Sequence, residues 1–202
     1  MKSDAIAFGI AGIAFGLIAG WIIGTQQATL GRAPAQPAAA ASSSAPAAAP
    51  PAAVLDDNKV NAFKSVAERE PTNPKPRVEL GNIYFDAERY DDAIKWYGDA
   101  LKLDPKDVNV STDLGVSYYY TNQPDKALAQ FDQSLKIDPK HAKTILNVGI
   151  VKAFGKQDLE GAQQAWQQVI QLAPDSPEGQ AAKRALDSLR SAHPGGGGKP
   201  GA

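Results

Sequence analysis

Histidines, cysteines and closely spaced carboxylates are the side chains that most often carry out chemistry, and this chain holds few of them. Its 202 residues include two histidines and no cysteine, which excludes disulfides, thiolate ligands and cysteine nucleophiles. Neither His141 nor His193 has a second histidine or a suitably spaced carboxylate near it, so neither predicts a metal site. We therefore expect no catalytic residues, no metal and no cofactor, and a protein that is not an enzyme.

The other motifs that resemble chemical sites have structural explanations. Asp91 and Asp92 stand where a helix is expected to begin, and the helix dipole favours negative charge there. The sequences DPKD at 104–107 and DPKH at 138–141 mark helix ends. GGGGK at 195–199 lacks the following Ser or Thr of a phosphate-binding loop. A net charge of −1 provides no basic field, so no nucleic-acid partner is expected.

An internal repeat sets the elements that must position any binding surface. The sequence LGNIYFDAERYDDAIKWYGDALKLDP, from Leu80, recurs as LGVSYYYTNQPDKALAQFDQSLKIDP from Leu114, 34 residues later. In a third copy the second half follows its counterpart by 35 residues, which predicts one inserted residue in the turn around 155–158. Apolar residues recur at intervals of three and four, so each copy is expected to form two helices.

The order Leu-Gly, Tyr, Ala, Phe or Tyr, Ala and Pro at this period resembles the tetratricopeptide repeat. The resemblance implies an all-α solenoid of helix-turn-helix units. Departures are Arg77, Ser111 and Ile145, which stand where the family usually has an aromatic residue. The expected organisation is a degenerate half-repeat at 56–73, repeats at 74–107, 108–141 and 142–175 with the insertion in the third, and a capping helix at 176–192.

Residues 5–24 form an uncharged apolar run that predicts one transmembrane helix. Twenty residues in a helix span about 30 Å, the thickness of a bilayer's hydrocarbon core. The alternative is a cleaved signal peptide, which would have a shorter apolar region and a more basic start. Glycines spaced by four form a stripe that favours self-association of two such helices, and hence a homodimer; ordinary membrane-helix composition is the alternative. These are Gly12, Gly16, Gly20 and Gly24.

The segments that flank the helices predict disorder. Residues 25–55 are rich in Ala, Pro and Ser, have little to bury and contain scattered prolines, so we expect a disordered linker. Residues 193–202 are expected to form a disordered glycine-rich tail. A short amino end before a large domain favours a single-pass protein of a bacterial inner membrane, with the repeat domain in the periplasm.

In the tetratricopeptide family the first helix of each pair lines a concave groove that receives an extended peptide or a helix. The resemblance therefore implies a protein partner bound at the following positions: Lys75, Val78, Asn82, Phe85, Asp86, Asn109, Thr112, Val116, Tyr119, Tyr120, Lys143, Leu146, Ile150 and Phe154. Tyr118 is expected to face the core, and Tyr119 and Tyr120 the groove, because successive helical side chains point about 100° apart. The alternative is that one of these two packs against the neighbouring repeat.

Some family members bind the carboxylate ends of chaperones through lysines and asparagines in the groove. Asn82 and Lys143 match two positions of that clamp, whereas Val78, Asp113 and Asn147 do not match the other three. Asp113 would place a negative charge beside the ligand carboxylate, so this partner is not expected.

The expected function is that of a membrane-tethered scaffold for protein–protein interaction. One alternative is an accessory factor of c-type cytochrome maturation that holds apocytochrome, which the sequence AQQAWQQVIQLAPDSPEGQAAKRAL from Ala162 resembles. The weakest alternative is an enzyme with an unrecognised site. The three interpretations differ in the partner that they predict, so capture of the partner separates them.

Overall fold

The computed structural model describes residues 54–192. The predicted transmembrane helix with its four glycines, nearly all of the predicted linker, and the predicted tail lie outside these residues. Among residues 54–192, none of the helices has the length and apolar character needed to cross a membrane.

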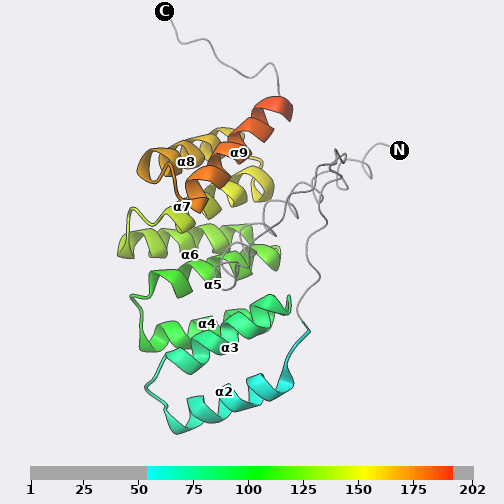
Figure 1. Ribbon diagram of the computed structural model, residues 1–202, viewed down its shortest axis with the longest axis vertical. Helices are drawn as coiled ribbons and strands as arrows, with labels where there is room; N and C mark the ends of the chain where they lie inside the picture. The colour runs from blue at the N-terminus through cyan, green and yellow to red at the C-terminus, as the bar shows by residue number, and fades with distance from the viewer. Residues whose placement is uncertain (1–53, 193–202) are drawn as a thin grey trace, which may run out of the picture.

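The described residues form an all-α stack, with eight α-helices and one π-helical turn. Helix α2 lies at one end of the long axis and α9 at the other (Figure 1). Consecutive helices pack on one another as α3 with α4, α5 with α6, and α7 with α8. The elements are α2 (Asp57–Arg69), α3 (Lys75–Asp86), α4 (Tyr90–Leu103), α5 (Val108–Tyr120), α6 (Pro124–Ile137), α7 (Ala142–Ile150), η1 (Val151–Gly155), α8 (Leu159–Leu172) and α9 (Pro177–Ala192).

Short polar side chains fix where several helices begin. The carboxylate of Asp56 accepts hydrogen bonds from two backbone amides of α2 at 3.1 Å, and Asp107 does the same for α5 at 3.0 Å. Asp158 and Ser176 cap α8 and α9, each with one amide, at 2.8 and 3.0 Å. Such caps satisfy amides that have no partner within the helix. The DPKD sequence follows the end of α4 at Leu103, as predicted, and its Asp107 in addition caps the start of α5.

The two helices of each repeat meet where a glycine faces an aromatic ring. A methyl group added to Gly81, Gly115 or Gly149 would overlap the ring of Tyr97, Phe131 or Trp166, respectively. These three rings are 0–2% exposed, and they fill the space between the paired helices. The same close approach of a ring to a glycine therefore recurs in all three repeats.

The inserted residue of the third repeat lies in a helix, so its predicted place in the turn around 155–158 is wrong. In η1 the Lys156 amide donates to the Val151 carbonyl at 3.0 Å, five residues back, whereas the Thr121 amide of the second repeat donates four residues back at 3.1 Å. The extra residue widens the last turn of the first helix instead of lengthening the connection. The turn that follows has Gln157 at φ 56°, as Asn122 is at φ 59° in the second repeat.

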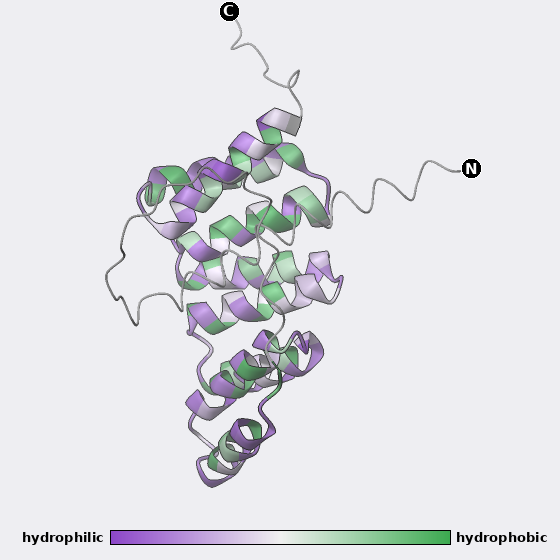
Figure 2. Cartoon of the chain, turned by 45° about the vertical axis from the view of Figure 1, so that its right-hand side comes forward, coloured by the Kyte–Doolittle hydropathy of each residue, from purple (hydrophilic) through white to green (hydrophobic). Residues whose placement is uncertain are grey.

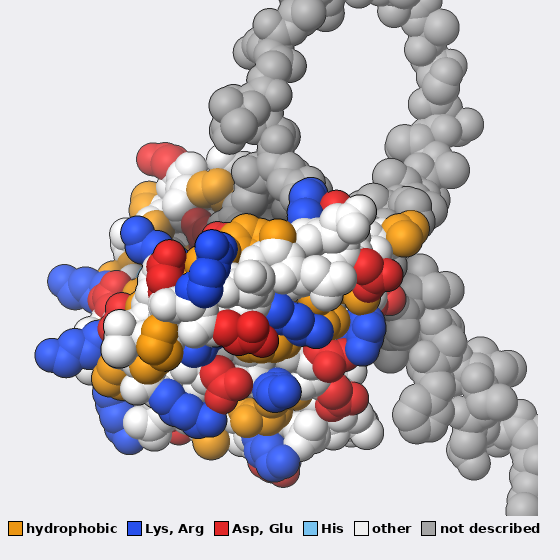
Figure 3. Space-filling model, turned by 90° about the horizontal axis from the view of Figure 1, so that it is seen from below, with side chains coloured by type: hydrophobic (Ala, Val, Ile, Leu, Met, Phe, Trp, Pro, Cys, Tyr) orange, Lys and Arg blue, Asp and Glu red, His pale blue; other side chains and the backbone are white. Residues whose placement is uncertain are grey.

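The core follows the stack from one end to the other. Each helix carries hydrophobic residues beside hydrophilic ones (Figure 2), as expected for elements that bury one side. Helix α9 closes the far end, where Ala182 (0% exposed) and Leu186 (4%) join the buried cluster around Trp166. On the face seen from below, lysine and arginine side chains alternate with acidic ones and make no single-sign field (Figure 3).

Candidate functional site

The residues predicted to bind a partner lie on the first helix of each repeat, and the structure separates them by exposure. Three are exposed: Lys75, Asp86 and Asn109. Eight are half-buried: Val78, Asn82, Phe85, Val116, Tyr119, Tyr120, Lys143 and Phe154. We call these eleven residues the first-helix face. They remain candidates for partner binding.

Three predicted positions are core residues, and their assignment to a binding groove is wrong. Thr112 is 0% exposed because α7 packs against α5 at this point, and its Oγ1 lies 2.6 Å from Oγ1 of Thr144. Leu146 and Ile150 are 1% and 4% exposed. Both belong to the cluster that α7 shares with α8 and α9. The expected capping helix, α9, packs on α7 as well as on α8, so it covers these first-helix positions of the third repeat.

The three consecutive tyrosines are all half-buried, in three different environments. Tyr118 packs against the clusters of repeats one and two, with Nζ of Lys126 5.7 Å from its ring centre, so it contacts the core without being fully buried. Tyr119 packs against the clusters of repeats two and three. Tyr120 stacks on Tyr90 of the first repeat, which is the alternative considered from the sequence.

An aromatic junction formed by Phe85, Tyr90, Tyr119 and Tyr120 connects the first two repeats. The rings of Tyr90 and Tyr120 lie parallel with centres 4.5 Å apart, and Phe85 meets them edge-on at 5.2 and 5.9 Å. Burial raises the pKa of Tyr90 and of Tyr119 to about 12, and it also raises that of Tyr120. These hydroxyls therefore stay protonated at neutral pH, and the junction presents neutral rings with polar ends.

The aromatic junction borders a hollow of about 500 Å³ at the turn between α3 and α4. Tyr90 and Tyr120 supply its aromatic wall, and the rest of the lining is polar or charged. Within it the guanidinium of Arg89 pairs with the carboxylate of Asp92 at 2.6 Å. Tyrosine and arginine are enriched among the residues that contribute most to protein binding, so Arg89, Tyr90 and Tyr120 suit a protein-binding anchor.

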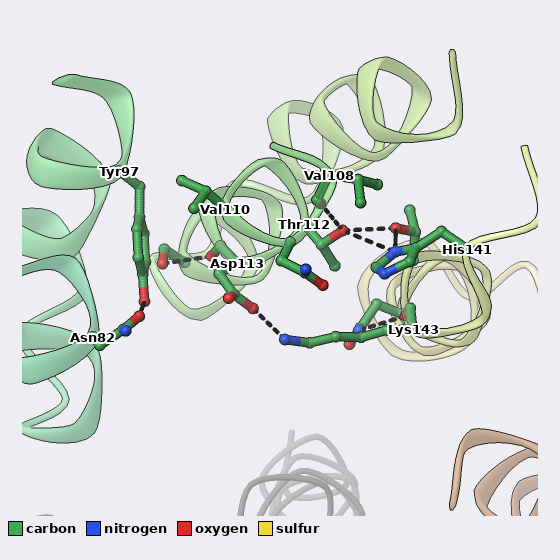
Figure 4. Close-up of polar contacts among 12 residues, drawn as sticks. Asn82, Tyr97, Val108, Val110, Thr112, Asp113, His141 and Lys143 are labelled. Carbon is green, nitrogen blue, oxygen red and sulfur yellow. Dashed lines mark hydrogen bonds and ion pairs between the residues drawn. The ribbon is translucent and has the colours of Figure 1, made fainter. Parts of the chain in front are cut away.

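The first-helix face also carries opposite charges at the junction of repeats two and three. Nζ of Lys143 lies 2.7 Å from Oδ1 of Asp113, and both side chains are about one-quarter or less exposed (Figure 4). Burial raises the pKa of Asp113, although Lys143 acts in the opposite direction. Burial also raises the pKa of Asp86, and the neighbouring charge of Asp113 adds to that effect. Among residues 54–192, Asp86 forms no ion pair, so it adds a carboxylate without a paired cation to this part of the face.

A polar network lies behind this ion pair. Nδ1 of His141 lies 2.7 Å from Oγ1 of Thr144, and Thr112 donates to the carbonyl of Val108 at 2.7 Å (Figure 4). Burial is the largest effect on the pKa of His141 and lowers it. Nδ1 of His141 also lies 3.5 Å from Oγ1 of Thr112, so His141 connects α5 with the start of α7. Among the residues that the structure describes, no group of three His, Cys, Asp or Glu side chains is placed to hold a metal ion.

Sequence reasoning missed one residue and one contact of this site. Tyr90 was not assigned to the site, because the equivalent positions in the next repeats are Pro124 and Leu159 and no repeated aromatic marks it. The pairing of Asp113 with Lys143 joins residues 30 positions apart. A carboxylate and an ammonium one helical turn apart in repeat register, on successive first helices, could have indicated it.

Comparisons with known proteins agree with the helical pairs seen here. A model described as "TPR repeat" matches residues 81–121, and one described as "Tetratricopeptide repeat" matches residues 110–141. A search of curated proteins finds no match.

Several solved structures share the fold. A crystal structure of MamA is 20% identical, with 67% of this chain and 80% of that chain covered and a TM-score of 0.56. YrrB, whose structure is described as a TPR protein with an unusual peptide-binding site, is 23% identical over 63% of this chain and 64% of its own, with a TM-score of 0.57.

The first TPR of Spaghetti (RPAP3) bound to the HSP90 peptide SRMEEVD is 23% identical over 68% of this chain and 95% of its own, with a TM-score of 0.51. Identities this low establish the fold alone. Together, the helical pairs, the glycine–aromatic contacts and the matches over residues 81–141 show that this chain carries tetratricopeptide repeats and that its described part is a tetratricopeptide-repeat solenoid.

Proposed function

We propose that the chain is a scaffold for protein–protein interaction that binds an extended peptide or a helix of another protein on the first-helix face. The aromatic junction is the observation that carries the proposal. Four rings lie beside one another at the boundary of two repeats, and they remain only partly buried. Two structural neighbours are described by the peptides or peptide sites that they hold, which supports a similar use of this fold.

A partner held by its terminal carboxylate does not suit this face. Lys143 occupies one clamp position, but its ammonium already pairs with Asp113. Asp86 adds a second carboxylate nearby, and its pKa is raised first by burial and then by the negative charge of Asp113. A ligand carboxylate would meet repulsion there, so the partner is bound through internal side chains.

The proposed site of action is the surface of a bacterial inner membrane. Residues 5–24 act as the anchor and residues 25–55 as the linker, with the solenoid in the periplasm. The support is the uncharged run of twenty residues and the Ala- and Pro-rich composition after it. Pairing of two chains through the glycine stripe would present two such faces to one partner.

Photo-crosslinking tests the first-helix face. A photoreactive side chain replaces Asp86 or Asn109 on that face, or, as matched controls, exposed Lys95 or Asp132 on second helices. All four positions are exposed, so the fold is expected to tolerate each change. We expect a discrete crosslinked partner in native membranes from the first pair alone. Equal adducts from the control pair would place binding elsewhere, and apocytochrome in the adduct would favour the cytochrome-maturation function.

Fractionation tests the anchor. The full chain is expected in the membrane fraction, whereas a chain that starts at residue 54 is expected in the soluble fraction. Gly16→Leu with Gly20→Leu should retain membrane association but reduce energy transfer between labelled chains, because larger side chains keep two helices apart. Recovery of the truncated chain in membranes would contradict the anchor, and unchanged energy transfer would contradict the dimer.

A further inference from the structure

A second hollow lies between α4 and α6, on the opposite helix of each pair from the first-helix face. It encloses about 680 Å³, within the range of about 300–1,000 Å³ that is typical of binding pockets. We call it the α4–α6 hollow. Buried Ser111 and Leu114 lie at its base, and half-buried Leu101 and Ile137 line its sides. The hollow therefore offers an apolar interior that the fold itself leaves unfilled.

Gly98 keeps this hollow open without serving the packing of the fold. It lies in the interior of α4, where glycine destabilises a helix relative to alanine. A methyl group added there would meet no atom within 4 Å apart from its own stretch of helix, whereas one added to Gly81, Gly115 or Gly149 would overlap a ring. Helix packing explains those three glycines but does not explain Gly98. Its lack of a side chain instead leaves space for a group from outside.

The rim of the α4–α6 hollow is basic. Its charged lining residues are Lys102, Lys106 and Lys136, and no acidic residue lines it. Lys102 pairs with Asp99 along α4 at 2.6 Å, while Lys106 and Lys136 make no ion pair with any residue of the described chain. Three ammonium groups around an apolar interior are complementary to an apolar side chain with carboxylates on either side.

We propose that the α4–α6 hollow is a second docking site, which receives an apolar side chain from a partner protein segment whose flanking residues are acidic. The apolar side chain enters beside Gly98 and covers Leu101 and Leu114. The flanking carboxylates pair with the three lysines. No residue that lines this hollow belongs to the aromatic junction or to the first-helix face, so one chain can hold two protein segments at once.

The absence of cysteine from the chain permits a direct test in the full-length protein. Gln133→Cys provides a single labelling position for an environment-sensitive dye at the rim of the hollow, where Gln133 is exposed, and it leaves Gly98 open. The probes are three synthetic peptides: a leucine pair flanked by glutamates, the same pair flanked by lysines, and a serine pair flanked by glutamates. We expect a saturable dye response to the first peptide only, and we expect this response to weaken as salt is added.

Block and charge-reversal variants then locate the contact, with the label placed on the first peptide. Gly98→Trp fills the hollow and should weaken binding by about tenfold or more, because the apolar side chain can no longer be buried. Gln167→Trp is the matched control, because Gln167 is exposed at the equivalent position of the third repeat and does not line the hollow. Lys102→Glu with Lys106→Glu and Lys136→Glu should reverse the preference in favour of the lysine-flanked peptide.

Equal binding of the three peptides, or equal loss in Gly98→Trp and Gln167→Trp, would overturn the proposal. Binding that survives Gly98→Trp but fails when Asn109 on the first-helix face is changed to Trp would assign the peptide to that face and would also overturn it. Gly98→Ala adds a folding control, because it should raise helix stability while leaving most of the hollow open. Loss of the peptide from a well-folded Gly98→Trp variant would thus be a loss of the site itself.

Discussion

The two junctions between successive repeats are built from different chemistry. Between repeats one and two, the aromatic junction holds the helices together through ring contacts at 4.5–5.9 Å. Between repeats two and three, an ion pair at 2.7 Å and hydroxyl contacts at 2.6 and 2.7 Å take that place. The first junction rests on apolar area and ring geometry, and the second on directional polar contacts. One solenoid therefore joins equivalent helices in two ways.

The two junctions should therefore respond differently to substitutions and to pH. Removing apolar area from the ring contacts lowers the free energy of unfolding in proportion to the area removed. This contribution depends little on pH. Removing either partner of a partly buried ion pair lowers the free energy of unfolding, because the remaining charge is then partly buried without a counter-charge. We expect the first junction to be sensitive to side-chain size and the second to charge and pH.

The largest effect is expected at the aromatic junction. Tyr90→Ala removes two ring pairs and half-buried area, and should lower the free energy of unfolding by about 2–3 kcal/mol. Tyr90→Phe keeps the ring and should cost less than about 0.5 kcal/mol. Chemical denaturation of each variant measures the difference. Similar losses for both variants would assign the stability to the hydroxyl and would remove the distinction between the junctions.

The ion pair should give the next largest effect, and it should depend on pH. Lys143→Met leaves Asp113 without its cation and should cost about 1–2 kcal/mol at neutral pH. Burial already holds the pKa of Asp113 above its ordinary value, and loss of Lys143 raises it further. When the pKa of a carboxyl group is higher in the folded state than in the unfolded state, its ionised form lowers the free energy of unfolding. This loss of stability is present above the raised pKa and is relieved as the pH falls below it. The loss should therefore shrink as the pH falls through the raised pKa.

Lys156→Met is the matched control for that charge effect. Lys156 also bridges repeats two and three, through Asp125 at 2.7 Å, but this pair is largely exposed. Exposed pairs contribute little, so the expected change is below about 0.5 kcal/mol, with little pH dependence between pH 4 and 7. Thermal melts at several pH values measure both variants. A constant loss for Lys143→Met across that range would contradict a penalty carried by Asp113.

The smallest effect of this set belongs to the hydroxyl network. Thr112→Val keeps the shape of the side chain but removes its contacts with Val108 and Thr144, and should cost about 1 kcal/mol. Thr72→Val, at an exposed turn position, is the control and should have little effect. If Thr112→Val destabilised the fold more than Tyr90→Ala, the polar junction would be the stronger of the two.

The fold was largely predictable because period and composition report directly on helix packing. The 34-residue spacing of Gly81 and Gly115 reflects a physical requirement, the close approach of a ring from the paired helix. The binding surface was less predictable, because exposure depends on what packs next to a helix. Leu146 resembled a surface position by repeat alignment alone, and the covering helix α9 made it core.

At the aromatic junction, too, repeat spacing was not enough to predict which residues meet. Tyr120 was predicted from its place in the helix, while Tyr90, its stacking partner, lies at the start of another helix and has no repeated counterpart. Pairings of this kind depend on the angle between helices, which repeat spacing does not encode. The same is true of the α4–α6 hollow, where only the position of Gly98 indicated a departure from the repeat.

The π-helical turn η1 also determines how this architecture tolerates a change in length. In a continuous α-helix one additional residue rotates everything after it by about 100°. Such a rotation would turn α8 away from α7 and separate Trp166 from Gly149. The wide turn absorbs the additional residue and so avoids this rotation. Trp166 accordingly packs on Gly149 just as Phe131 packs on Gly115. The end of a first helix can therefore accept an additional residue, while the helices before and after it keep the relative orientation that packs them together.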